Sequence, residues 1–370
     1  MKQILYLLLF PVLCYSCSSE DQKPQQVTLE KNHIETLFSE IELGKYPATN
    51  AILISQNDSL LFEKYFNGYG KDSLQDVRST TKSITALLAG IAMDQGILKV
   101  DAPILSYLTQ YNKSNLDHWD DRKSLITVED LLTMRTGIGC EQFFGDLGFP
   151  DCEEKMFDQK DWVKYGLDQE MAFAPKEKWL YTGTAPMIMG AVISESSQTS
   201  IADFAAKNLF APLNITNNYQ WAKNEATGRY FTAGNLRISP RNMAKIGHMV
   251  IHNGKYNGQQ VISEKMIHEI LDEKVKLPND YSFFKTAGNS WEGQESASYG
   301  YYWYTEKVKI NEKEITLKFT FGNGGNYIIL IPELNDLVVV FTGSNYGKPI
   351  LNKQPFDMMY RYILPYFIEK

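Results

Sequence analysis

Residues 78–97 read Arg-Ser-Thr-Thr-Lys-Ser-Ile-Thr-Ala-Leu-Leu-Ala-Gly-Ile-Ala-Met-Asp-Gln-Gly-Ile, and they predict the helix around which the rest of the chain is organised. Ser79 and Lys82 are three positions apart, so on a helix they share one face about a turn apart. The start of a helix also offers free backbone N–H groups and the positive end of the helix dipole. A neighbouring amine can take the proton of a serine hydroxyl, so this spacing is typical of a nucleophile beside its base.

The Ser-x-x-Lys spacing is weak by itself, because it occurs twice in the chain. Ser79 precedes an apolar stripe of helical period, whereas Ser282 and Lys285 are followed by Thr-Ala-Gly-Asn, which predicts a loop. The stripe consists of Ile84, Leu87, Leu88 and Ile91. From the spacing alone, the plainer interpretation of Ser79 is a polar N-cap followed by a solvated lysine.

The composition of the 370 residues is that of an ordinary globular protein, with 44% hydrophobic and 22% charged residues. This length predicts one large domain or two interleaved ones. The net charge of −7 and the lack of a basic patch give no electrostatic reason to expect a nucleic-acid partner.

The first residues have the layout of an export signal. Lys2 precedes an apolar run at residues 4–13 that is too short to span a bilayer. Residues 14–17, Cys-Tyr-Ser-Cys, resemble a bacterial lipobox with Cys17 as the lipidated residue. We therefore expect a signal peptide at 1–16, a lipidated polar tether at 17–30 and a folded domain at 31–370. The expected location is periplasmic, outer-membrane or cell-surface, and the alternative is an ordinary signal peptide cleaved nearby.

Export also determines which cysteines remain in the folded protein and whether they can form a disulfide. Cys14 leaves with the signal peptide and Cys17 carries lipid, so Cys140 and Cys152 remain, on either side of a short loop. An oxidising compartment favours a disulfide between them. A buried pair of free thiols is the alternative.

The distribution of strand and helix patterns predicts an α+β fold. Two strands joined by Asn57-Asp58 lie before the Ser79 helix, and short β-branched or aromatic runs fill the last third of the chain. The middle is mainly helical, with start signals such as Ser239-Pro240. We therefore expect one antiparallel sheet built from about 31–78 and 285–370, with a helical region at about 79–284 inserted.

Several motifs follow one another in a recognisable order. They are the Ser79 box after a hairpin at 52–69, the segment 127–138, Tyr181-Thr-Gly183, the segment 233–236 with Ser239-x-x-Asn242, and the segment 322–326. In this order the chain resembles the β-lactamase-related serine hydrolases, the family of class C β-lactamases, D,D-peptidases and their esterase relatives. The resemblance covers about residues 34–366 and implies the fold of that family.

The resemblance also implies catalytic roles. Ser79 is expected to attack a carbonyl and form an acyl-enzyme, with Lys82 as base or proton shuttle. Tyr181 occupies the family's Tyr-x-Asn position, where the phenol helps to relay a proton to the leaving group. Gly183 stands where Asn or Ser is usual, so one side-chain contact to the substrate is missing. A structural aromatic residue beside Trp179 is the alternative for Tyr181.

In the third motif, Asn323 stands where Lys or His is usual. Gly324 and Gly325 would let a substrate lie against the strand edge, and the resemblance makes the N–H of Asn326 the second oxyanion donor beside that of Ser79. A plain glycine-rich hairpin turn is the alternative. A neutral amide at Asn323 binds a substrate carboxylate only weakly, which favours esters or amides that lack one.

Other chemistries fit the sequence less well. No Gly-x-Ser-x-Gly elbow accompanies the five histidines, which argues against a Ser-His-Asp triad. His248 and His252 are spaced i, i+4 but lack the glutamate of a zinc motif, so we interpret them as helix-surface residues and expect no metal. No cofactor is expected.

The sequence thus predicts a serine hydrolase acting on a small ester, amide or peptide. One alternative is a penicillin-binding peptidase or β-lactamase, and another is a non-catalytic surface lipoprotein that binds a ligand. Which of Lys82 and Tyr181 is the base, the substrate and the oligomeric state stay open.

Overall fold

The computed structural model describes residues 32–142, 151–278, 281–289, 295–310, 313–348 and 350–368. Residues 1–32 and 33–370 separate into two units, and the description below concerns the second. The predicted signal peptide, the tether and Cys17 lie outside the described residues. Among the described residues, no helix is long and apolar enough to cross a membrane.

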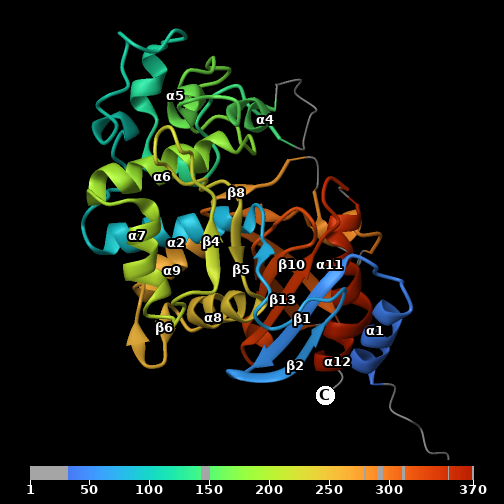
Figure 1. Ribbon diagram of the computed structural model, residues 1–370. Helices are drawn as coiled ribbons and strands as arrows, with labels where there is room; N and C mark the ends of the chain where they lie inside the picture. The colour runs from blue at the N-terminus through green and yellow to red at the C-terminus, as the bar shows by residue number, and fades with distance from the viewer. Residues whose placement is uncertain are drawn as a thin grey trace, which may run out of the picture. The chain divides into compact units, whose positions relative to one another are not determined.

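Both ends of this unit join in one eight-stranded antiparallel sheet, as the sequence predicts (Figure 1). The strands lie in the order β2-β1-β13-β12-β11-β10-β9-β8. Their bounds are Thr49–Gln56 (β1), Ser59–Tyr65 (β2), Val275–Lys276 (β8), Ser298–Tyr299 (β9), Tyr304–Ile310 (β10), Lys313–Phe319 (β11), Tyr327–Ile331 (β12) and Leu337–Gly343 (β13).

The first and last strands of the chain pair next to one edge of this sheet, where β2 is the outer strand, and every residue of both strands except Gln56 is buried. Leu53 lies opposite Val340 and Ile54 opposite Val339, and all four side chains are buried. Asn57 and Asp58 turn the β1–β2 hairpin with φ angles of 48° and 60°, the left-handed conformation that short hairpin turns require. The register therefore follows from burial on both faces of β1 and β13.

Helices cover both faces of the sheet (Figure 1). On one face α8 (Pro240–Ile251) packs on β1, β12 and β13, and Gly247 permits the close approach. A Cβ atom added at Gly247 would lie 2.7 Å from Val338 and 2.9 Å from Ile328. On the other face lie α1 (His33–Glu42), α11 (Gln354–Met358) and α12 (Leu364–Ile368), where Phe62 of β2 contacts Phe38 and Tyr366.

The inserted region is less uniformly helical than the sequence predicts. Its helices are α2 (Thr80–Asp94), α3 (Val128–Leu132), α4 (Cys152–Met156), α5 (Trp162–Leu167), α6 (Thr184–Ser197), α7 (Ile201–Ala205) and α9 (Glu264–Leu271). A small sheet, β3 (Gln75–Asp76), β5 (Leu236–Ile238) and β4 (Tyr219–Trp221), lies among them, and β8 of the main sheet also falls inside the predicted helical range. Strands of two or three residues are too short to show a periodic pattern.

Local start signals are borne out where a side chain satisfies the first turn. Ser239 caps α8 with Pro240 at the first position, and Thr127 forms a capping box with Asp130 at α3. The loop predicted at Thr-Ala-Gly-Asn begins one residue later than expected, because Ser282 caps the short helix α10 (Phe283–Thr286), after which Ala287 and Gly288 form a turn. The Ser282 hydroxyl also bonds the Glu306 carboxylate, so this second Ser-x-x-Lys sequence is a helix cap.

His248 is not the surface residue that its helical spacing suggested. Its Nε2 lies 2.6 Å from the buried hydroxyl of Ser55 on β1, and its Nδ1 lies 3.8 Å from Asp58. His252 lies 3.4 Å from the same Asp58 carboxylate. Among the described residues no group of His, Cys, Asp and Glu could hold a metal ion. The pair therefore joins α8 to the β1–β2 hairpin.

The buried contact of His248 predicts that the free energy of unfolding decreases in acid. Burial lowers the pKa of His248 below its usual value, against the opposing effect of Asp58. The unfolded chain, with a histidine pKa of about 6.5, then binds more protons than the folded one, so stability falls as the pH drops through about 6.5. We expect H248Q to reduce this loss. Urea unfolding at successive pH values measures it, and an unchanged slope in H248Q would contradict the assignment.

Candidate active site

Ser79 lies at the N-terminus of α2, directly after a residue in an uncommon backbone conformation. Arg78 has a φ angle of 50°, and its N–H donates to Asp76 Oδ1 at 3.0 Å. The N–H of Ser79 has no acceptor among the described residues, and Ser79 is partly exposed. Residues 80–92 of α2 are all buried, which fixes the position of its first turn.

Lys82 is buried with its amine held against the Ser79 hydroxyl. Lys82 is only 1% exposed, and its Nζ lies 2.9 Å from Ser79 Oγ. Nζ also donates to the carbonyl oxygen of Ala233 at 2.8 Å. Pairing of β3 with β5 brings this carbonyl there, because Val77 N–H also bonds Leu236 O at 3.0 Å. The solvated lysine that the spacing left open is therefore not present.

Tyr181 lies beside Lys82. It is 2% exposed, and the centre of its ring lies 5.1 Å from Lys82 Nζ. Its carbonyl accepts from Gln142 N–H at 2.7 Å, and Trp179 contacts its ring. Nearby, burial raises the pKa of the Tyr299 and Tyr302 hydroxyls well above the usual value, so both stay neutral.

Glu153, at the start of α4, is a site residue that the sequence analysis missed. Its Oε2 lies 3.8 Å from Lys82 Nζ, and this buried atom has no hydrogen-bond partner among the described residues. The same carboxylate lies directly against Gly183. A Cβ atom added at Gly183 would be 1.9 Å from Oε2. The space that a side chain at 183 would need is therefore filled by Glu153.

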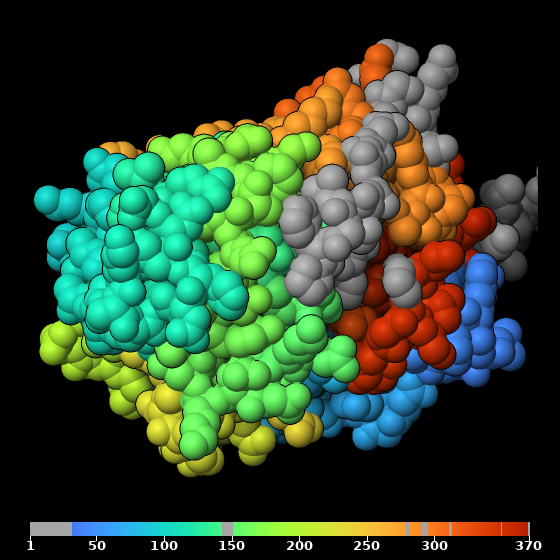
Figure 2. Space-filling model, turned by 90° about the horizontal axis from the view of Figure 1, so that it is seen from above, coloured from blue at the N-terminus to red at the C-terminus, as the bar shows by residue number. Residues whose placement is uncertain are grey.

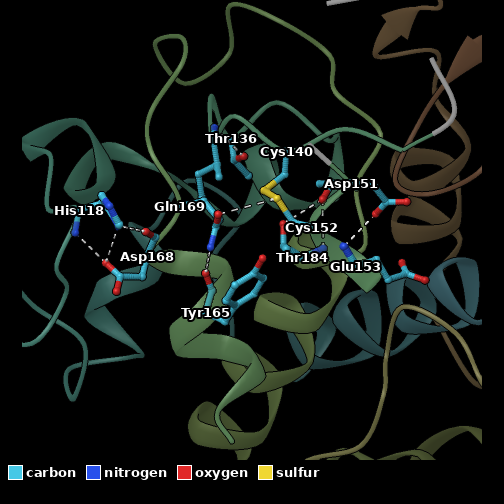
Figure 3. Close-up of a disulfide and its surroundings, with 12 residues drawn as sticks. His118, Thr136, Cys140, Asp151, Cys152, Glu153, Tyr165, Asp168, Gln169 and Thr184 are labelled. Atoms are coloured by element: carbon cyan, nitrogen blue, oxygen red, sulfur yellow. Dashed lines mark hydrogen bonds and ion pairs between the residues drawn. A yellow bond between two sulfur atoms is a disulfide. The ribbon is translucent and has the colours of Figure 1, made fainter. Parts of the chain in front are cut away.

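A disulfide lies directly before Glu153 in the chain (Figure 3). The structure pairs Cys140 with Cys152, directly before Glu153, and Gln142, which bonds the backbone of Tyr181, follows Cys140 by two residues. Figure 3 shows the Glu153 carboxylate on the side away from the disulfide. Figure 2 shows the green segment that contains α4 and α5 beside the red C-terminal segment on one face of the molecule.

The third motif does not present its predicted oxyanion donor. The N–H of Asn326 donates to Gly322 O at 3.0 Å, because Gly324 and Gly325 adopt φ angles of 99° and 95° and close a tight turn. The hairpin turn that the sequence analysis kept as an alternative is the one observed. Gly322 places this turn against the start of α2, since a Cβ atom there would lie 2.1 Å from Val77 O.

Asn323 is held by the protein itself. Its Oδ1 accepts from Gly347 N–H at 3.1 Å and from Asn352 Nδ2 at 3.4 Å. The missing side chain of Gly324 makes room for the ring of Tyr346, which would lie 2.7 Å from a Cβ atom. Asn323 and Gly324 therefore both stabilise the turn, and the space beside Gly324 is filled by Tyr346 instead of being left open for a substrate at the strand edge.

One further cation lies near this turn. Lys353 follows Asn352 in the chain, and its ammonium lies 5.1 Å from the ring centre of Phe321 and 5.3 Å from that of Tyr281. Burial lowers the pKa of Lys353 to about 8. Aromatic rings thus enclose its charge, which is a structural use of a lysine.

The disulfide gives a stability prediction. Cys140 and Cys152 are 12 residues apart, and closing a loop of this size stabilises a fold by about 3 kcal/mol. We expect C140S/C152S to lower the free energy of unfolding by about this amount, as measured by urea denaturation. A reducing agent should reproduce the loss in the wild type and change nothing in the double variant. An unchanged stability in both experiments would contradict the pairing.

Comparison with known proteins agrees with this fold. The Beta-lactamase family model matches residues 48–355. The 6-aminohexanoate-dimer hydrolase of Paenarthrobacter ureafaciens is 22% identical over 60% of this chain, which spans 57% of that protein. Penicillin-binding protein 4* of Bacillus subtilis is 23% identical over 50% of the chain, which spans 40% of that protein.

Among solved structures, the penicillin-binding protein homologue from Pyrococcus abyssi superposes with a TM-score of 0.61 at 18% identity, over 89% of this chain and 76% of its own. A likeness at this identity shows the fold. Because the family model covers most of the chain, the protein belongs to the β-lactamase family of serine hydrolases and their relatives.

Proposed function

We propose that this protein is a serine hydrolase that cleaves an ester or amide through an acyl-enzyme on Ser79. The observation that carries the proposal is the buried amine of Lys82 at 2.9 Å from Ser79 Oγ. A serine hydroxyl gains nucleophilicity when a base lies within hydrogen-bond reach, and this amine is at that distance.

In the proposed reaction Lys82 Nζ takes the proton of Ser79 Oγ while the oxygen attacks the substrate carbonyl. The N–H of Ser79 faces the developing oxyanion. As the tetrahedral intermediate collapses, the leaving group receives a proton from Lys82 or through Tyr181, which lies beside the amine. A water molecule then attacks the acyl-enzyme, the same groups move its proton, and the acid is released.

The charges of the site favour substrates without a carboxylate next to the scissile bond. Asn323 is neutral and its oxygen is occupied by Gly347 and Asn352. Glu153 adds a carboxylate beside Lys82, which repels a second anion. Relatives named as a 6-aminohexanoate-dimer hydrolase and as an esterase, EstB of Burkholderia gladioli, are compatible with amides or esters as substrates.

Two other functions are less well supported. A penicillin-binding peptidase or β-lactamase would bind a substrate carboxylate, for which Asn323 is poorly suited. A non-catalytic ligand-binding protein would have no physical need for a buried lysine at a serine hydroxyl, since burying an amine is costly. Export and a lipid anchor at Cys17 remain part of the proposal, on the sequence pattern of residues 1–30.

A fluorophosphonate probe tests the nucleophile. We expect labelling of the wild type, no labelling of S79A, and labelling at least about a hundredfold slower in K82A, because a general base contributes about that much. In-gel fluorescence over time gives the rates, and S282A is the matched control that should label like the wild type. Folded wild type that does not react would refute the hydrolase assignment.

Substrate preference can be tested with p-nitrophenyl esters, D-amino-acid amides, nitrocefin and a fluorescent penicillin. The neutral Asn323 and the carboxylate of Glu153 predict weak or no acylation by the penicillin, and turnover of at least one ester or amide. Rapid stoichiometric acylation by penicillin would instead favour the cell-wall peptidase. Measuring every compound on S79A separates catalysis by Ser79 from background hydrolysis.

A further inference from the structure

The carboxylate of Glu153 and the glycine at 183 are a matched pair. A Cβ atom at Gly183 would lie 1.9 Å from Oε2, 2.7 Å from Cδ and 2.9 Å from Cγ of Glu153. Real Cβ contacts are not this short, so a side chain at 183 and Glu153 in its present position exclude each other. By its position in the Tyr-x-Asn motif, Gly183 is where the family resemblance places a polar side chain. The polar group is therefore still in the site, but it comes from another segment.

The surroundings of Lys82 show what this group contacts. Two oxygens lie at hydrogen-bond distance from Nζ, Ser79 Oγ at 2.9 Å and Ala233 O at 2.8 Å. Glu153 Oε2 is the third oxygen, at 3.8 Å, and the ring of Tyr181 covers another side. Oε2 is buried and has no hydrogen-bond partner among the described residues, and Lys82 Nζ is the basic group that lies 3.8 Å from it.

We propose that Glu153 is a positioning residue of the active site, which holds the Lys82 amine toward Ser79 and balances the ammonium charge formed there. When Ser79 Oγ attacks, its O–H bond breaks and an N–H bond forms on Lys82. The carboxylate of Glu153 then faces an ammonium instead of an amine, which lowers the free energy of the charged state. This inference rests on the proposed function and goes beyond it, because Glu153 lies outside the motifs on which that function depends.

The disulfide explains how a residue of a five-residue helix can be held this closely. Cys152 precedes Glu153 and is bonded to Cys140, and Asp151 caps the helix by accepting from the Glu153 N–H at 2.9 Å. The backbone of Glu153 is therefore fixed on its N-terminal side. Glu154, the next residue, is exposed and provides a matched control.

The test exchanges the polar group between the two positions. We expect E153Q and E153A to lower kcat for a p-nitrophenyl ester by about tenfold or more. This is a smaller loss than the roughly hundredfold or more that follows removal of the general base itself. KM and the melting temperature should change little, and E154Q should behave like the wild type. Adding G183N to E153A should restore kcat at least about tenfold, because the amide then reaches Lys82. E153A/G183A supplies only a methyl group and should restore nothing.

Two outcomes would overturn the inference. One is an E153Q variant with wild-type kcat and wild-type labelling by fluorophosphonate. The other is a loss of kcat that parallels a loss of melting temperature and returns equally in E153A/G183A, which is the signature of a packing role. A wild type without labelling would instead refute the hydrolase itself.

A readout without substrate separates the two failures. In ¹⁵N-lysine NMR spectra the resonance of Lys82 Nζ should differ between E153Q and the wild type, because the carboxylate oxygen 3.8 Å from this nitrogen is lost. An identical Lys82 resonance in both proteins would refute the pairing of Glu153 with Lys82, whatever reaction the protein catalyses.

Discussion

The structure of the site depends on keeping one lysine amine buried against a serine hydroxyl. Removing an ammonium or amine from water is unfavourable unless polar partners replace the water. Lys82 has such partners in Ser79 Oγ, Ala233 O and the carboxylate of Glu153. These groups come from three separate segments of the chain. The fold around α2 can therefore be understood as the arrangement that brings these segments to one amine.

Different interactions hold the Ala233 segment and the Glu153 segment next to Lys82. The short pairing of β3 with β5 places the Ala233 carbonyl beside the turn that leads into α2. The disulfide between Cys140 and Cys152 holds the Glu153 segment next to that of Tyr181. Neither interaction belongs to the large sheet. The sheet gives α8 and the hairpins a rigid base, and these two smaller connections set the geometry at Nζ.

The strands of the large sheet could be predicted because each is recognisable from its own short stretch of sequence. β1 and β13 each contain a short apolar run, at residues 51–54 and 337–341, and helix starts such as Ser239-Pro240 carry their own hydrogen-bonding partners. The turn at 322–326 was predicted wrongly in detail, since the sequence does not distinguish an extended Gly-Gly pair from one with positive φ. Ser79, Lys82 and Tyr181 could be placed together by their motifs. Glu153 could not, because its contact with Lys82 is long-range and no spacing rule describes it.

Gly183 was nevertheless the available signal for Glu153. A glycine in place of an expected polar side chain has two physical explanations, a lost contact or a space taken by another residue. The sequence alone suggests the first, and the structure shows the second, because Glu153 fills that space. The exchange also alters the charge of the site, since a carboxylate replaces a neutral amide next to Lys82. The carboxylate of Glu153 and the neutral side chain of Asn323 both make the site less favourable for an anionic substrate.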